Sequence, residues 1–155
     1  MNVEIKKTIS NFYNLSIFEF SNLVIFQFSL YLPIMKSILL VAAGGAMGAV
    51  LRYLFSVLLK DYIQISFPVN TFLVNAIGCF AIGLCYALFM SNNNFDSLKL
   101  LLIVGVLGGF TTYSTFAFET VLMFKQQLFK QAFTYILLSN IICIAFAYLG
   151  FSIKN

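Results

Sequence analysis

Four long apolar segments dominate this chain and restrict it to the membrane. They cover residues 35–59, 68–90, 98–124 and 129–151, with short polar breaks between them. Each is longer than the roughly 18 apolar residues that indicate a membrane-spanning helix, and about 20 residues cross the hydrocarbon core of a bilayer. Only 9% of the residues are charged, which leaves no segment for a soluble domain. The sequence predicts an all-α membrane protein with four transmembrane helices.

Residues 1–34 differ from the rest in pattern. They carry Glu4, Lys6, Lys7 and Glu19 and an aromatic-rich stretch without regular periodicity. No clean apolar core followed by a small-residue cleavage site marks a signal peptide. We expect an N-terminal extension here, either outside the native reading frame, with Met35 as the natural start, or lying at the membrane interface. Residues 35–155 would then form the four-helix domain.

Lysines are distributed evenly between the two sides of an alternating four-span arrangement. Three lie on one side and three on the other: Lys36, Lys99 and Lys154 against Lys60, Lys125 and Lys130. Lysine and arginine bias in short loops sets orientation, so a balanced chain is expected to insert both ways. This predicts dual topology and an antiparallel homodimer in the cell inner membrane. The scattered basic residues suit lipid head groups rather than nucleic acid.

The third apolar segment is interrupted by a polar run. Two glycines precede a cluster of hydroxylated residues: Gly108-Gly109-Phe110-Thr111-Thr112-Tyr113-Ser114-Thr115-Phe116, closed by Glu119. Irregular backbone at membrane depth is tolerated only where protein or a water-filled cavity covers it. Discontinuous helices of this kind place backbone dipoles around ions. We therefore predict that the third helix is broken mid-membrane and that the function lies there.

Polar residues also interrupt the first and second segments. Gly44, Gly48 and Arg52 share one helix face, and small residues at this spacing allow close helix packing. Arg52 either extends toward the membrane surface or lines an aqueous vestibule. Asn75 lies on a stripe of small residues in the second segment. Its amide either joins helices or donates N–H groups to an anion.

Aromatic and sulfur-containing residues allow both packing and functional interpretations. Tyr113 and Phe116 are three residues apart, and their positive ring edges could surround a small anion. In the fourth segment Tyr135 and Ser139 share a face, a pattern more often due to helix contact than to an ion path. We expect the cysteines to act as small hydrophobic residues in helix packing: Cys79, Cys85 and Cys143.

Three motifs in order resemble the Fluc (CrcB) family of fluoride channels. They are Gly44-Gly45-Ala46-Met47-Gly48-Ala49 with Arg52-Tyr53, then Asn70 to Gly78 with Phe80 and Gly83, then Gly105 to Glu119. The resemblance covers the chain from Met35 nearly to its end. Tyr113 stands where the family commonly has Phe, and Asn70 stands where it commonly has Gly.

The resemblance implies a fluoride-selective channel that exports fluoride passively from the cytoplasm and so reduces its toxicity. It also implies an antiparallel homodimer with two pores and a structural Na⁺ at the interface. The Na⁺ ligands would be backbone carbonyls of Gly108 and Thr111. The expected pore residues are Arg52, Asn75, Tyr113, Ser114, Thr115, Phe116, Glu119, Tyr135 and Ser139.

Two other kinds of membrane protein compete with this interpretation. A small four-span proton-coupled multidrug exporter needs a carboxylate in its first helix, where this chain has Arg52. A non-transporting assembly factor leaves Asn75 and the hydroxyl cluster unexplained. An enzyme is not expected, because the chain contains no His and no recognisable pair of nucleophile and base.

Overall fold

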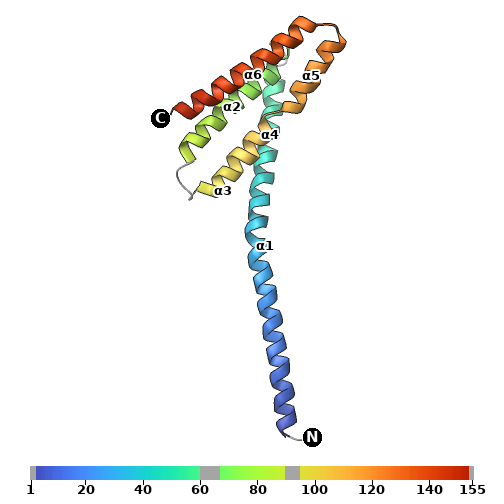
Figure 1. Ribbon diagram of the computed structural model, residues 1–155, viewed down its shortest axis with the longest axis vertical. Coiled ribbons are helices and arrows are strands. Elements are labelled where there is room, and N and C mark those ends of the chain that lie inside the picture. The colour runs from blue at the N-terminus through green and yellow to red at the C-terminus, as the bar shows by residue number, and fades with distance from the viewer. Residues whose placement is uncertain (1–2, 60–66, 90–94, 154–155) are drawn as a thin grey trace. The chain divides into compact units, whose positions relative to one another are not determined.

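The computed structural model describes residues 3–59, 67–89 and 95–153, and these residues form helices joined by short connections (Figure 1). In chain order the elements are α1 (Val3–Leu59), α2 (Val69–Phe89), α3 (Asp96–Lys99), η2 (Leu100–Leu107), α4 (Gly108–Phe110), α5 (Tyr113–Lys125) and α6 (Phe129–Ser152). The segment η2 is π-helical, which makes it wider than an α-helix. The expected all-helical class is confirmed for the described residues.

Among the described residues, four helical stretches are long and apolar enough to cross a membrane. They are Glu19–Leu59, Val69–Phe89, Asp96–Lys125 and Phe129–Ser152. The third combines α3, η2, α4 and α5. Three of the four agree closely with the predicted spans, and the number of spans is confirmed. The protein is therefore a multi-pass membrane protein.

The first helix begins much earlier than the apolar pattern suggested. It starts at Val3 rather than near residue 35, and its candidate span extends back to Glu19. Pro33 lies inside the helix, and the Ser37 hydroxyl donates to the Pro33 carbonyl at 2.9 Å. Proline lacks a backbone N–H donor, but a helix can continue through it with a kink. Residues 3–34 therefore belong to the same helix as the residues that follow.

The chain divides into two compact units, Met1–Ile38 and Leu39–Asn155. In the first unit, large apolar side chains such as Phe20, Phe26 and Phe28 are exposed. The second unit contains every residue of the candidate site. The expected division into residues 1–34 and 35–155 stays a prediction. Lys60, Lys154 and part of the polar break after the second apolar segment, residues 91–94, lie outside the described residues.

Within the second unit, α2 and α6 lie side by side and run in the same direction (Figure 1). Two glycines set their distance. A Cβ on Gly83 would overlap the carbonyl oxygen of Ala147, and one on Gly150 would overlap the carbonyl oxygen of Phe80. Because each helix places a glycine against the other helix's backbone, the two backbones are in direct contact.

Two glycines of α1 likewise allow its backbone to contact the backbone of the third candidate span. A Cβ on Gly44 would overlap the carbonyl oxygen of Leu101, and one on Gly48 would overlap that of Val106. The close helix packing predicted for this face is confirmed. It brings residues 44–52 of α1 alongside the segment that leads into the polar run.

A tight turn joins α5 to α6. Gln127 has a φ of 59°, and the N–H of Leu128 donates to the carbonyl of Met123 at 2.9 Å. This is the hydrogen bond that closes many helix C-termini, with Gln in the position usually held by Gly. The turn allows α5 and α6 to pack on a small core: Phe116, Met123, Ala132 and Tyr135.

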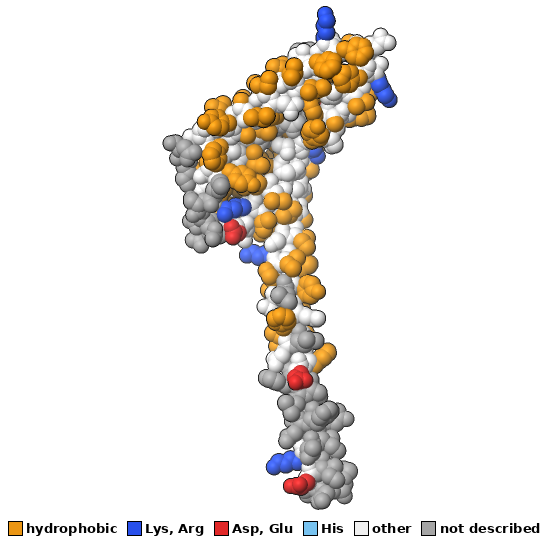
Figure 2. Space-filling model, in the orientation of Figure 1, with side chains coloured by type: hydrophobic (Ala, Val, Ile, Leu, Met, Phe, Trp, Pro, Cys, Tyr) orange, Lys and Arg blue, Asp and Glu red, His pale blue; other side chains and the backbone are white. Residues whose placement is uncertain are grey.

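Apolar side chains cover much of the outer surface of the second unit (Figure 2). On α6, the side chains of Ile141, Ile144 and Tyr148 are between 60% and 70% exposed. Such exposure suits a surface in contact with lipid or with another membrane protein, since hydrocarbon imposes no cost on apolar groups.

Candidate functional site

The helical path of the third candidate span is interrupted at two threonines. Thr111 has φ −74° and ψ 155°, and Thr112 has φ −149° and ψ 108°, so both are extended. Thr112 then caps α5, because its hydroxyl accepts a hydrogen bond from the N–H of Thr115 at 3.3 Å. Threonine is a favoured residue at this position. The polar run thus ends one helix and begins the next.

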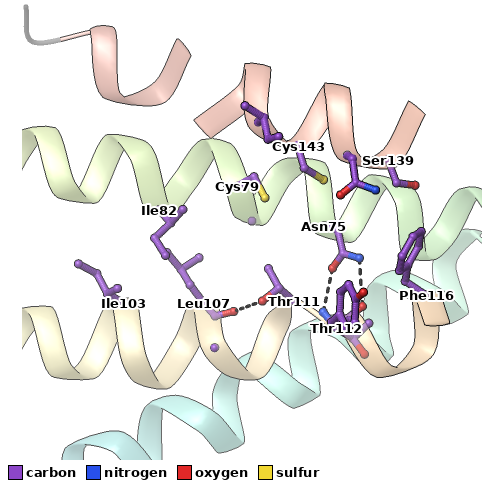
Figure 3. Close-up of a pocket in the computed structure, with 15 residues that line it drawn as sticks. Asn75, Cys79, Ile82, Ile103, Leu107, Thr111, Thr112, Phe116, Ser139 and Cys143 are labelled. Carbon is purple, nitrogen blue, oxygen red and sulfur yellow. Dashed lines mark hydrogen bonds between the residues drawn. The ribbon is translucent and has the colours of Figure 1, made fainter. Parts of the chain in front are cut away.

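At the interruption, the side chain of Asn75 on α2 forms hydrogen bonds with both backbone polar groups of Thr112. The N–H of Thr112 donates to Oδ1 of Asn75 at 2.8 Å, and Nδ2 of Asn75 donates to the carbonyl of Thr112 at 3.0 Å. Figure 3 shows both bonds. In a continuous helix, the N–H of Thr112 would donate to the carbonyl of Gly108. Because the Thr112 N–H donates to Asn75 instead, the Gly108 carbonyl does not accept this helical hydrogen bond.

A cavity of about 330 Å³ lies beside this interruption. Its lining brings together six of the predicted site residues, Asn75, Gly108, Thr111, Tyr113, Phe116 and Ser139, and it also includes Thr112. The Ser139 hydroxyl is buried and has no hydrogen-bond partner among the described residues. A buried hydroxyl without a partner is costly, so this group is available to a ligand in the cavity.

The predicted aromatic pair is only half enclosed. The ring centroids of Tyr113 and Phe116 are 5.5 Å apart, with an angle of 46° between the ring planes. Phe116 is 8% exposed and also packs on Tyr135 at 5.0 Å, whereas Tyr113 is 78% exposed. Within one chain, therefore, Phe116 is fixed by its surroundings and Tyr113 points away from the core.

A second cavity, of about 310 Å³, is also lined by Thr112. Arg52, Thr71 and Thr115 contribute to its lining. Nη1 of Arg52 lies 3.5 Å from the carbonyl oxygen of Thr111, a long contact that turns the guanidinium toward the threonine pair. Thr112 lines both cavities, and its hydroxyl shares a 2.9 Å hydrogen bond with that of Thr115.

Glu119 connects three helices. Its Oε1 accepts from the Thr71 hydroxyl at 2.8 Å, and its Oε2 accepts from the Tyr135 hydroxyl at 2.8 Å. Tyr135 is completely buried. Hydrogen bonds to a carboxylate are stronger than those between neutral groups. The predicted residues Glu119 and Tyr135 are thus brought together, and they hold α2, α5 and α6 in register.

Thr71 is a site residue that the sequence analysis missed. It lies four residues before Asn75 on α2, so both side chains share a helix face. That spacing was the available signal. Ser114, by contrast, was predicted but is more peripheral: it is exposed, and its hydroxyl lies 3.4 Å from that of Thr112.

Comparison with known proteins identifies the family. Residues 39–151 match the model of the family described as CrcB-like protein, Camphor Resistance (CrcB). The chain belongs to the CrcB family. The match begins at the residue where the second compact unit begins. It therefore covers the part of the chain that contains both cavities.

Two curated relatives are 42% and 43% identical to this chain. The fluoride-specific ion channel FluC of Shewanella frigidimarina (strain NCIMB 400) is 42% identical over 116 residues, which cover 75% of this chain and 94% of the relative. The fluoride-specific ion channel FluC of Shewanella denitrificans is 43% identical with the same coverage. The resemblance found in the sequence motifs is confirmed.

Proposed function

We propose that this protein is a fluoride-selective ion channel. The observation that carries the proposal is the enclosure of Asn75, Phe116 and Ser139 around one cavity at the helix interruption, in a chain whose relatives are named fluoride-specific ion channels. Those names favour neither an enzyme nor the multidrug exporter. The exporter is also disfavoured by α1, whose residues 39–59 include Arg52 and no acidic residue.

Selectivity would come from a dense set of weakly charged donors. Fluoride is small and strongly hydrated, so its water shell must be replaced at short distance. Asn75 has two N–H donors, of which one bonds Thr112, leaving the other for an ion. The unpartnered Ser139 hydroxyl and the ring edge of Phe116 face the same cavity. A larger anion such as chloride would not fit among groups held this rigidly.

Glu119 would not repel a passing anion as strongly as an isolated carboxylate would. Thr71 and Tyr135 both direct their hydroxyl protons toward it, which spreads its charge over three side chains. A fluoride ion moving along this path could replace the carboxylate as the acceptor of either hydroxyl. Glu119 would therefore position the donors near one end of the pore, and Arg52 would attract the anion at the vestibule.

Export would follow the membrane potential. An anion leaves a negative cell interior with a driving free energy of about 2.3 kcal/mol per charge per 100 mV. No coupling to another energy source is needed. In the inner membrane, a passive channel would lower cytoplasmic fluoride and so reduce its toxicity.

The second copy needed for an antiparallel homodimer would cover the outward-facing side of the interruption. Tyr113 is 78% exposed there, although the adjacent Phe116 and Thr112 are buried. A polar hydroxyl exposed beside a lipid-facing surface suits contact with protein. We therefore place the mid-membrane break and Tyr113 at the dimer interface, where Tyr113 would complete the aromatic pair of a pore.

A structural Na⁺ fits the same place. The Gly108 carbonyl has lost its usual helix donor to Asn75, and within the described part of the chain the Thr111 carbonyl accepts the long Arg52 contact. Carbonyl oxygens at unwound helix segments are suitable Na⁺ ligands. Bound Na⁺ would neutralise these dipoles and hold two copies together. The expected result is a higher melting temperature of the purified protein in NaCl than in KCl of equal ionic strength.

Ion efflux from liposomes tests the proposed function. Liposomes with the purified protein are loaded with KF or KCl and opened to potassium by valinomycin, and electrodes record the release of each anion. We expect rapid fluoride release with chloride release close to that of protein-free liposomes. Equal release of both anions would replace the proposal with an unselective anion pore.

A further inference from the structure

Two of the three cysteines line the first cavity. Cys79 of α2 and Cys143 of α6 both line it, their side chains interact, and Figure 3 shows the two side chains on neighbouring helices. The backbone explains this pairing. Gly83 packs on the backbone of Ala147, and each cysteine lies four residues, about one turn, before one of these contact positions on parallel helices.

The surroundings of this thiol pair restrict what it could bind. No group of three or more His, Cys, Asp or Glu side chains that could hold a metal occurs among the described residues, which excludes a four-coordinate zinc site of the usual kind. Both cysteines are free thiols and partly exposed. Two thiolates without further ligands suit a soft cation that accepts linear two-coordination.

We propose that Cys79 and Cys143 form a binding site for a soft d¹⁰ cation such as Cu⁺, Ag⁺ or Hg²⁺. Binding forms two metal–sulfur bonds and releases both thiol protons to solvent: two R–SH and Hg²⁺ give (R–S)₂Hg and two H⁺. Oxidation states do not change, so no oxidant is needed. Thiolate is the form that binds metal, and proton release makes binding stronger as pH rises.

The position of the site gives it a functional consequence, which rests on the proposed fluoride conduction. The thiol pair shares its cavity with Asn75, Phe116 and Ser139. A cation bridging the two sulfur atoms would occupy space in this cavity and would fix α2 to α6. Fluoride flux would then stop when the metal binds.

Intact-mass spectrometry tests metal binding without measuring transport. The full-length protein is reduced, incubated with HgCl₂, and washed with a low concentration of a monothiol to remove mercury held by a single cysteine. A bridged adduct gains one mercury and loses two hydrogens, with no additional ligand. We expect this adduct in the wild-type protein and in Cys85→Ser, which removes a thiol of α2 that lines a different cavity. We expect its loss in Cys79→Ser and in Cys143→Ser.

Fluoride efflux before and after HgCl₂ provides the second readout. Wild type and Cys85→Ser should lose nearly all flux, while each of the other two variants should retain its own untreated rate. A bridged adduct that persists in Cys79→Ser or Cys143→Ser, or its absence from the wild-type protein, would overturn the proposed site. Bridged mercury in a protein that never conducts fluoride would instead overturn the proposed function and leave the metal site intact.

Discussion

Phe116 is the residue in which packing and proposed ion contact are hardest to separate. It belongs to the small core around Tyr135, yet it also lines the first cavity with Asn75. An apolar side chain of similar volume would retain the core contacts. Only an aromatic ring offers a positive edge to an anion. Substitutions that remove the ring and retain the volume therefore distinguish the two roles.

Replacing Phe116 by Ile should reduce fluoride flux while the protein still assembles. Contacts with a ring edge contribute about 0.5–1.5 kcal/mol, which corresponds to roughly a two- to tenfold loss of rate. The measurement is fluoride efflux at equal protein density in liposomes. Phe118→Ile is the matched control, because Phe118 lies on the same helix and is 63% exposed. Undiminished flux in Phe116→Ile would show that the ring serves packing alone.

Thr71→Val removes the hydroxyl that donates to Glu119 and preserves the shape of the side chain. A hydrogen bond to a charged group contributes about 1.5–3 kcal/mol, so we expect a roughly ten- to hundredfold loss of flux. Thr120→Val is the control, since the buried Thr120 hydroxyl bonds the Phe116 carbonyl rather than a carboxylate. Similar losses in both variants, measured by the same efflux assay, would argue against a specific role of Thr71.

At the residue scale, six of the fifteen residues that line the first cavity were among the predicted site residues. Spacing along one helix drew attention to Asn75, Phe116 and Ser139, and the resemblance to the family supplied their expected pore roles. It could not show that Asn75 donates one N–H to Thr112, or that Thr71 and Tyr135 share Glu119. These contacts join different helices, and periodicity within one helix contains no information about its neighbour.

At the scale of elements, glycines decide how closely the helices approach. Gly83 and Gly150 allow α2 and α6 to touch, and Gly44 and Gly48 do the same for α1 and η2. Association of membrane helices depends on such close packing because lipid is as apolar as the side chains. A single methyl group at these positions is therefore expected to matter more than on a lipid-facing surface.

Gly83→Ala should lower the thermal stability of the purified protein. The added methyl would overlap the Ala147 carbonyl, and overpacking typically costs about 1–3 kcal/mol. Gly45→Ala is the matched control, because a Cβ there meets no atom within 4 Å. Melting curves of both variants in the same detergent provide the test. A melting temperature for Gly83→Ala equal to that of the control would mean that α2 and α6 are less tightly packed than described.

The apolar pattern predicted the helical spans better than it predicted where α1 begins. Residues 98–124 contain the pairs Gly108-Gly109 and Thr111-Thr112, and the backbone of both threonines is extended, whereas a break at mid-membrane depth stays a prediction. Residues 3–34 contain polar residues but no effective stop signal, because Pro33 is accommodated within α1. Composition marks a segment as suited to a bilayer, whereas helix ends depend on capping and on tertiary contacts.

At the scale of the whole molecule, the main open prediction is insertion in both orientations. A version starting at Met35 retains the balance of three lysines on each side, and the full-length chain adds Lys6 and Lys7 to one side. Because lysine bias sets orientation, the shorter version should insert both ways, and the longer one should favour an inside N-terminus. Accessibility of a tag placed after Asn155, measured in intact cells, reports the orientation.

Controls for this experiment come from the same lysines. Replacing Lys6 and Lys7 by Gln in the full-length chain should restore both orientations without shortening the protein. A single orientation of the version starting at Met35 would contradict dual topology, and with it the antiparallel homodimer. Fluoride flux from that version would show whether residues 1–34 are needed by the channel domain.

The two hydrogen bonds between Asn75 and the Thr112 backbone also have a consequence for membrane insertion during synthesis. Asn75 lies 37 positions before Thr112, so α2 leaves the ribosome before the polar run does. When the extended threonines enter the membrane, a partner for their peptide groups has already been inserted. The reverse order would place unpaired N–H and C=O groups in hydrocarbon until a later helix arrived. The order of helices along the chain therefore protects the interrupted segment during biosynthesis.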